Sequence, residues 1–313
     1  MESFLVAINA VIPFLCYISF GYAMKVKGVV KEEFLQQLNK MVFKVMYPFM
    51  TFYNIYKADA SSLPRPIMLI FSGVSILALE VILVFIVPKI VKENPKRGVI
   101  IQAVYRSNFV LFGLPLTISV FGDTASSVAA MVVTVVVTIY NTTSVVILEM
   151  FNSEGKTTAK SLLLNVAKNP LLQGAVVGLA FFFLGIKVPK SLLTPIAAFA
   201  DMTSPLALFV LGGSLHFNAI RGNLKYLVPT LSFKLLALPA LMLAIAYQFG
   251  LRELELFLLL AIYGTPVAAA SYPMAQNMGG DGELAGQFVV ISTVVSVVTL
   301  FVWIFFLKSM GLI

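Results

Sequence analysis

Tyr105–Asp123 reads YRSNFVLFGLPLTISVFGD, an apolar run that Asn108, Gly113 and Pro115 interrupt near its middle. Tyr263–Asp281 reads YGTPVAAASYPMAQNMGGD and carries the same kind of interruption in the second half of the chain. A proline has no amide donor and clashes with the preceding helical turn, so both runs predict helices that break within their own length. Two broken helices, one in each half, are typical of the core of a membrane transporter.

The two runs belong to a longer internal repeat. Four residue pairs are 158 positions apart, as in 263 − 105: Tyr105 and Tyr263, Pro115 and Pro273, Gly122 and Gly280, and Asp123 and Asp281. Three more pairs are 157 positions apart, as in 170 − 13: Pro13 and Pro170, Gly21 and Gly178, and Pro48 and Pro205. Proline and glycine are common in membrane helices and some pairs align by chance, but this many pairs at nearly one offset favour a true repeat.

Composition predicts an integral membrane protein. Of the 313 residues, 59% are hydrophobic and 12% are charged, and the mean hydropathy is +0.96, values that do not fit a soluble core. The net charge of +8 comes from Lys and Arg that lie mainly between apolar runs, where they orient membrane helices. Nucleic acid is therefore not an expected partner. The first run, Phe4–Met24, lacks a preceding basic region and a cleavage site, so we interpret it as a retained helix.

Residues for covalent or metal chemistry are scarce. The chain has one cysteine, Cys16, and one histidine, His216. These numbers argue against a disulfide framework, a metal site and a nucleophile–base pair. We expect no enzyme, no metal and no cofactor. A membrane sensor would normally carry a soluble output domain, and the loops are too short to hold one.

Ten apolar runs predict an all-α polytopic membrane protein with ten transmembrane helices, because about 20 residues cross roughly 30 Å of hydrocarbon. The approximate ranges are 3–24, 34–56, 66–88, 97–121, 124–148, 162–184, 190–215, 223–249, 254–278 and 282–307. Residues 151–160, which include the polar stretch NSEGKTTAK (152–160), form a short cytoplasmic linker between a first half (1–150) and a second half (161–313).

Five helices is an odd number, so the second half is expected to cross the membrane in the opposite sense. The result is a 5+5 inverted repeat in which helices four and nine are the broken ones. Lys and Arg are more frequent in the loops after odd-numbered helices, such as Lys89–Arg97, than on the opposite side. By the positive-inside rule those loops are cytoplasmic and both termini are outside.

Four ionisable residues fall near the centres of predicted helices, where a charge is costly and tends to face a cavity or a partner. Glu80 and Lys234, on helices three and eight, could form a buried pair that either fixes packing or responds to protons. Arg106 could bind a carboxylate through its two-pronged guanidinium, or have a structural or lipid-facing role. Asp201 has no evident partner and could carry a proton.

The breaks also free backbone groups around Pro115, Pro266 and Pro273, which a hydrated cavity or a ligand must satisfy at membrane depth. Half-helix N-termini carry partial positive charge and favour an anion. The predicted substrate-binding residues are Arg106, Asn108, Gly113, Pro115, Asn141, Thr265, Pro266, Ser271, Tyr272, Pro273 and Gln276, and the predicted coupling or gating residues are Glu80, Asp201 and Lys234. Each neutral polar residue among them could instead make an ordinary interhelical hydrogen bond.

Four motifs follow one another along the chain: NFVLFGLPL (108–116), NPLLQGAVVGL (169–179), GIKVP (185–189) and SPLALFVLGGSL (204–215). The first resembles the fourth-helix pattern of the auxin efflux carrier family, and the others resemble the sixth and seventh helices of its bacterial members. The resemblance extends over essentially the whole chain. It implies a ten-helix 5+5 inverted repeat with crossing helices four and nine, an architecture shared with sodium/bile-acid symporters and some sodium/proton antiporters.

The resemblance also implies a transport function, because family members include plant auxin exporters and bacterial permeases for malate, malonate and similar carboxylates. By resemblance to the plant carriers, Glu80 would be a proton-linked support residue behind the crossing. Two departures matter. The large central loop of the long plant carriers is absent, and the ninth helix has no acid between Leu256 and Gly280, where the bile-acid symporters place a sodium-ligating carboxylate.

We therefore expect a secondary transporter of a small mono- or dicarboxylate in the bacterial cytoplasmic membrane, working by alternating access. A core of helices three to five and eight to ten would move against a scaffold of helices one, two, six and seven. Protons are the expected coupling ion and sodium is less favoured. The alternative is a sodium/proton antiporter on the same fold. Membrane lipid is an expected partner, and a homodimer is left open.

Overall fold

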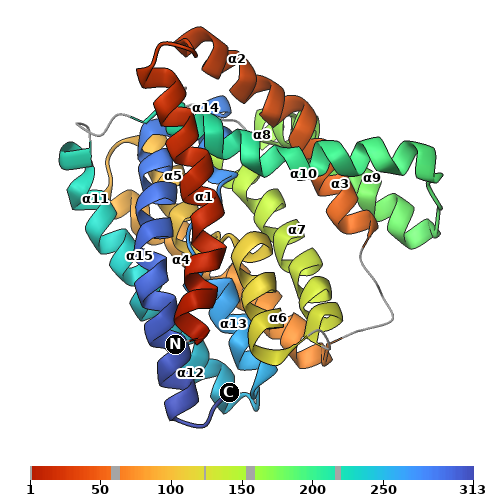
Figure 1. Cartoon of the computed structure of the whole chain (residues 1–313), viewed down its shortest axis with the longest axis vertical. Helices are drawn as coiled ribbons and strands as arrows, with labels where there is room; N and C mark the ends of the chain where they lie inside the picture. Colours follow the sequence, from red (N-terminus) through yellow and green to blue (C-terminus); the bar gives the residue numbers. More distant parts are fainter. Residues whose placement is uncertain (1, 58–63, 123–124, 153–158, 216–219) are drawn as a thin grey trace.

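The computed structural model of the chain describes residues 2–57, 64–122, 125–152, 159–215 and 220–313 (Figure 1). Within these ranges the chain is helical, and its one β contact is an isolated antiparallel bridge between Ser107 and Val267. The predicted all-α class is confirmed. Asp123, His216 and residues 153–158 of the predicted linker lie outside the described residues.

Helices follow one another along the described chain. In order they are α1 (Glu2–Val26), α2 (Glu32–Met41), the π-helix η1 (Val42–Met46), α3 (Tyr47–Tyr56), α4 (Pro66–Ile90), α5 (Asn94–Tyr105), the π-helix η2 (Phe109–Gly113), α6 (Leu114–Phe121), α7 (Ser126–Met150), α8 (Ala159–Lys168), α9 (Pro170–Leu184), α10 (Lys190–Gly213), α11 (Ile220–Ser232), the π-helix η5 (Phe233–Ala237), α12 (Leu238–Gln248), α13 (Leu254–Gly264), α14 (Ser271–Asn277) and α15 (Gly282–Ser309).

Among the described residues, five helices are long and apolar enough to cross a membrane on their own: α4, α7, α10, the continuous helix through α11, η5 and α12, and α15. α8 and α9 make a sixth if this pair, bent by 66°, is one crossing. Together with the composition, these helices identify a multi-pass membrane protein. Every one of the ten predicted ranges contains helix, but five of them hold helices that are broken, bent or interrupted by a π turn.

Proline explains three of these interruptions. The π turns η1, η2 and η5 are each followed directly by a helix whose second residue is proline, namely Pro48, Pro115 and Pro239. Proline cannot donate to the carbonyl of the preceding turn and its ring clashes there, so the chain widens by one residue per turn. The predicted break at Gly113 and Pro115 is therefore a bulge in continuous helix.

Helices α1, α3, α9 and α10 pack through glycines, and in Figure 1 α3, α9 and α10 lie together at the upper right. A Cβ placed at Gly212 on α10 would overlap the backbone of Ile18 on α1, and one placed at Gly174 on α9 would lie 2.5 Å from the carbonyl oxygen of Pro48 on α3. Small residues at these crossings let the helix backbones approach closely.

A second group of helices packs around α13, whose residues from Glu255 to Gly264 are all buried. Helices α6, α7, α12 and α15 contact α13, and α5 contacts α4, α7, α11 and α15. α1 joins the two groups because it packs along both α10 and α15. This arrangement places the gap between α13 and α14, and the gap after α5, at the centre of the protein.

Candidate functional site

The gaps in the two broken helices lie against each other. α5 ends at Tyr105, and Arg106 is extended with φ −86° and ψ 111°. The backbone N–H of Asn108 donates to the carbonyl of Pro266 at 2.8 Å, and Ser107 bridges Val267 in the antiparallel sense. The freed backbone groups of one segment are therefore partly satisfied by the other segment, and not only by a cavity or a ligand as the sequence predicted.

Two of the three prolines predicted to free backbone groups do not lie in these gaps. Pro115 lies at the π bulge inside the continuous helix formed by η2 and α6. Pro273 occupies the first turn of α14, where a helix leaves its N–H groups unpaired in any case. The gaps are at Arg106–Asn108 and at Thr265–Ala270, and only Pro266 lies within one.

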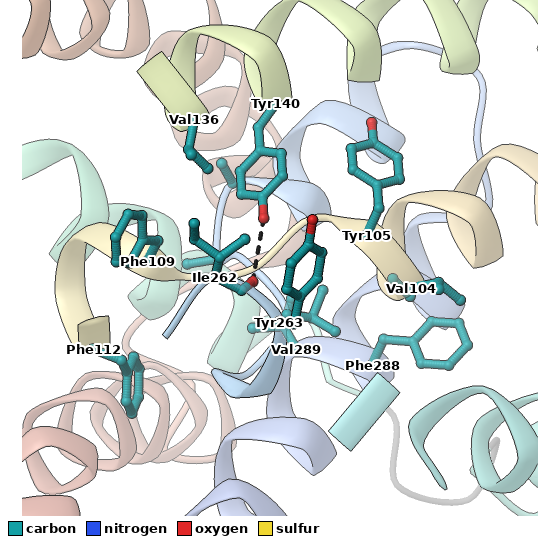
Figure 2. Close-up of a cluster of buried hydrophobic side chains, with 14 of the residues drawn as sticks. Val104, Tyr105, Phe109, Phe112, Val136, Tyr140, Ile262, Tyr263, Phe288 and Val289 are labelled. Atoms are coloured by element: carbon teal, nitrogen blue, oxygen red, sulfur yellow. Dashed lines mark hydrogen bonds between the residues drawn. The ribbon is translucent and has the colours of Figure 1, made fainter. Parts of the chain in front are cut away.

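Tyrosines surround the place where the gap at Arg106–Asn108 meets the gap at Thr265–Ala270, which we call the crossing (Figure 2). Tyr140 on α7 donates its hydroxyl to the carbonyl oxygen of Ile262 at 3.2 Å, and the rings of Tyr105 and Tyr263 lie beside it. The Tyr263 hydroxyl bonds to Ser75 on α4 at 2.6 Å. These bonds tie the crossing to two neighbouring long helices, which holds the ends of the broken helices in place.

A cavity of about 660 Å³ lies beside the crossing. Arg106, Asn108 and Asn141 form its buried end, and the exposed residues Lys57 and Ser119 lie at its other end. Its remaining walls are largely apolar and aromatic, with Phe14, Tyr17, Tyr47, Phe109, Tyr140 and Leu208 among them. The cavity thus joins a cationic, amide-lined floor to the surface near the C-terminal ends of α3 and α6.

Arg106 is the charged group at this floor, and its side chain is 3% exposed. Its Nη2 donates to Oδ1 of Asn141 at 2.7 Å and its Nη1 approaches the sulfur of Met274 at 2.6 Å. Among the described residues it forms no ion pair. The side-chain nitrogen of Asn108 is buried without a hydrogen-bond partner. A buried cation without a carboxylate partner among the described residues, beside a buried amide donor without an acceptor, favours an anion at this position.

The predicted site residues divide into three sets. Arg106, Asn108, Pro115, Asn141 and Asp201 line the cavity. A second set is buried around the crossing and does not line the cavity: Gly113, Thr265, Pro266, Ser271, Tyr272 and Pro273. Gln276, on α14, is exposed and lies outside the cavity. The gap between α13 and α14 instead lines the cavity with the methyl groups of Ala268, Ala269 and Ala270.

Glu80 and Lys234 do not pair with each other. Glu80, on α4, accepts a hydrogen bond from the Thr143 hydroxyl at 2.6 Å. Lys234, in η5, is fully buried and donates to the hydroxyl of Ser107. The pair was predicted because both residues fall near the midplane of helices that the repeat relates, and depth does not specify the direction in which a side chain points.

Several residues at the site were not predicted from the sequence. Ser107 bridges the two broken segments, Tyr47 and Tyr140 form aromatic walls, and Lys57 lies at the exposed end of the cavity. The sequence held one indication of Tyr47 and Tyr140. Each directly precedes a residue that was named from the sequence, Pro48 and Asn141 respectively. Within the described ranges, no three His, Cys, Asp or Glu residues lie close enough to hold a metal ion.

The sequence model of a family described as "Membrane transport protein" matches residues 6–304. An uncharacterized transporter of Methanocaldococcus jannaschii is 25% identical over 313 residues, covering 96% of this chain and 98% of the relative. An uncharacterized transporter of Methanothermobacter thermautotrophicus is 23% identical over 305 residues, with the same shares of each chain covered.

Proposed function

The chain belongs to the membrane transport protein family, the auxin efflux carrier family that its motifs resemble, and we propose that it is a secondary transporter of a small organic anion. The anion is a mono- or dicarboxylate, and the protein moves it across the cytoplasmic membrane by alternating access. It performs no enzymatic reaction and needs no cofactor.

The observation that carries this proposal is the buried, unpaired Arg106 at the floor of the cavity. A carboxylate can accept two parallel hydrogen bonds from a guanidinium, and the free amide nitrogen of Asn108 supplies a further donor. Asn141 holds the guanidinium from the side of α7. Interactions of this kind are strong in a low-dielectric site because little water competes for the donors.

For the architecture we propose ten membrane crossings arranged as a 5+5 inverted repeat. Helix packing supports it: α1 packs along α10, and α3 packs along α9. In the ten-helix numbering these are helix one with seven and helix two with six, two contacts that a twofold relation between halves would exchange. Helices one, two, six and seven form the scaffold, helices three to five and eight to ten form the moving core, and both termini lie outside.

For coupling we propose that protons drive transport and that Glu80, Asp201 and Lys234 respond to them. Asp201 is exposed and lines the cavity. Glu80 and Lys234 lie behind the crossing, bonded to Thr143 and Ser107 respectively. A sodium site is less favoured because the described residues hold no cluster of acids.

Transport of labelled carboxylates into proteoliposomes tests the proposal. Arg106→Gln should abolish saturable uptake or raise its KM by at least tenfold, because the cationic partner of the carboxylate is lost. Gln276→Ala is a matched control: it removes a polar side chain predicted at the site from sequence but found outside the cavity. Unchanged carboxylate affinity in Arg106→Gln would refute the site. A sodium-dependent pH change without carboxylate uptake would point to the antiporter instead.

A further inference from the structure

Lys234 is a buried lysine that forms no ion pair with any described residue. Its side chain is 0% exposed and its Nζ donates to the Ser107 hydroxyl. A buried ammonium normally has a carboxylate partner, because desolvation of the charge is costly. A single hydroxyl compensates that cost only in part, so the charge of Lys234 depends on any other charge brought near it.

The elements packed against η5 provide no acid for Lys234. These elements are α5, α11, α12, α13 and α15. Their ionisable residues are Lys96, Arg97 and Tyr105, with Arg106 directly after α5; Arg221, Lys225 and Tyr226; Tyr247; Glu255 and Tyr263; and Glu283 and Lys308. Of the two acids, Glu255 pairs with Arg65 and Glu283 accepts a hydrogen bond from Gln287.

Ser107 connects Lys234 to the floor of the cavity. It lies between Arg106 and Asn108 in the chain, and its backbone bridges Val267 of the other broken helix. An anion bound by Arg106 and Asn108 would be the negative charge that the surroundings of Lys234 lack. Glu80 is a weaker candidate for sensing that anion, since its carboxylate is bonded to Thr143 on α7 and not to the crossing.

We infer that Lys234 is the residue that couples anion binding to proton uptake, acting through Ser107 at the crossing. As one anion binds at Arg106, one proton from solution adds to the lone pair of the neutral amine on Nζ, and the reverse happens on release. By linkage, the anion raises the proton affinity of Lys234 by the same factor by which the proton raises the affinity for the anion. The inference rests on the proposed anion site and specifies its coupling residue.

Calorimetry on the full-length protein in detergent counts the protons directly. Benzenesulfonate is the probe, because its negative charge does not change across the neutral pH range. Titrations in buffers that differ in ionisation enthalpy separate the heat of binding from the heat of proton uptake. The variants are Lys234→Met, Ser107→Ala and Glu80→Gln. Lys225→Met is the matched control, since Lys225 is exposed on α11.

The wild type and Lys225→Met should take up a proton with the anion, and their affinity should weaken by up to about tenfold per pH unit as the pH rises. Lys234→Met should bind the anion without proton uptake and with an affinity independent of pH. Ser107→Ala should reduce the uptake, and Glu80→Gln tests the rival in which Glu80 takes up this proton in place of Lys234. Thermal melting verifies that each variant is folded.

Anion binding with unchanged proton uptake in folded Lys234→Met overturns the inference and leaves the anion site intact. Loss of uptake in Glu80→Gln but not in Lys234→Met also overturns it. If the folded wild type binds neither benzenesulfonate nor any carboxylate, the proposed function itself fails and the inference fails with it.

Discussion

Replacement of Gly212 by alanine should force α1 and α10 apart. A Cβ at this position would lie 2.7 Å from the carbonyl carbon and 2.9 Å from the Cα of Ile18, and closer still to the Ile18 oxygen. Ordinary contact begins at 3.4 Å, so the helices must separate by at least 0.7 Å (3.4 − 2.7) to clear the carbonyl carbon, and by more to clear the oxygen. The obstacle is backbone, which no change of side-chain rotamer can move.

The cost of this separation should be about 1–3 kcal/mol, the usual range for overpacking a close contact. Alanine also gains about 1 kcal/mol in helix propensity over glycine, which partly hides that cost. Gly222→Ala in α11 isolates the propensity term, because Gly222 is exposed and a Cβ there meets nothing within 4 Å. The difference in stability between the two variants is therefore the cost of forcing α1 and α10 apart.

Thermal unfolding of the purified variants in detergent measures this difference. Gly222→Ala should melt at or above the temperature of the wild type, and Gly212→Ala should melt several degrees lower. Equal melting temperatures for the two variants would show that α1 and α10 do not approach as closely as the structure indicates, and the packing argument for the glycines would be refuted.

Two further changes test other contacts. Asn141→Leu removes the acceptor of Arg106, so the KM for carboxylate uptake should rise about tenfold, a hydrogen bond to a charged group being worth about 1.5–3 kcal/mol; an unchanged KM in proteoliposomes would contradict it. Arg65→Gln removes the two-pronged partner of Glu255, and because the Arg65 side chain is 58% exposed the loss in stability should be small, since solvent screens the pair. Melting at low and at high salt checks this, since only the wild type should lose stability as salt is added.

Much of the local structure could be predicted from sequence. The apolar runs locate helices in all ten predicted ranges, because burial in lipid leaves helix as the natural way to satisfy the backbone. The interruption predicted at Pro115 takes the form of a π turn, and Pro48, where no interruption was predicted, also follows one. The exact position of the gap at Thr265–Ala270 was less predictable. Pro273 lies beyond this gap in the first turn of α14, where a proline costs little.

The candidate site was only partly predictable. Arg106, Asn108 and Asn141 were singled out in the sequence because a cation and amides in apolar helices rarely face lipid, and all three line one cavity. Gln276 is exposed although it lies on the second broken segment. Its type and depth did not distinguish the face of α14 that turns toward the cavity from the face that turns away.

The sequence by itself determined that this is a helical membrane protein with two interrupted segments, since both properties follow from apolar content and from proline chemistry along the chain. Only the tertiary structure decided which buried charges meet. Glu80 and Lys234 both fall near the centres of apolar helices, yet one bonds to Thr143 and the other to Ser107. The physical reason is that a side chain's partner depends on helix rotation and on the crossing of distant segments, and neither is encoded in local periodicity.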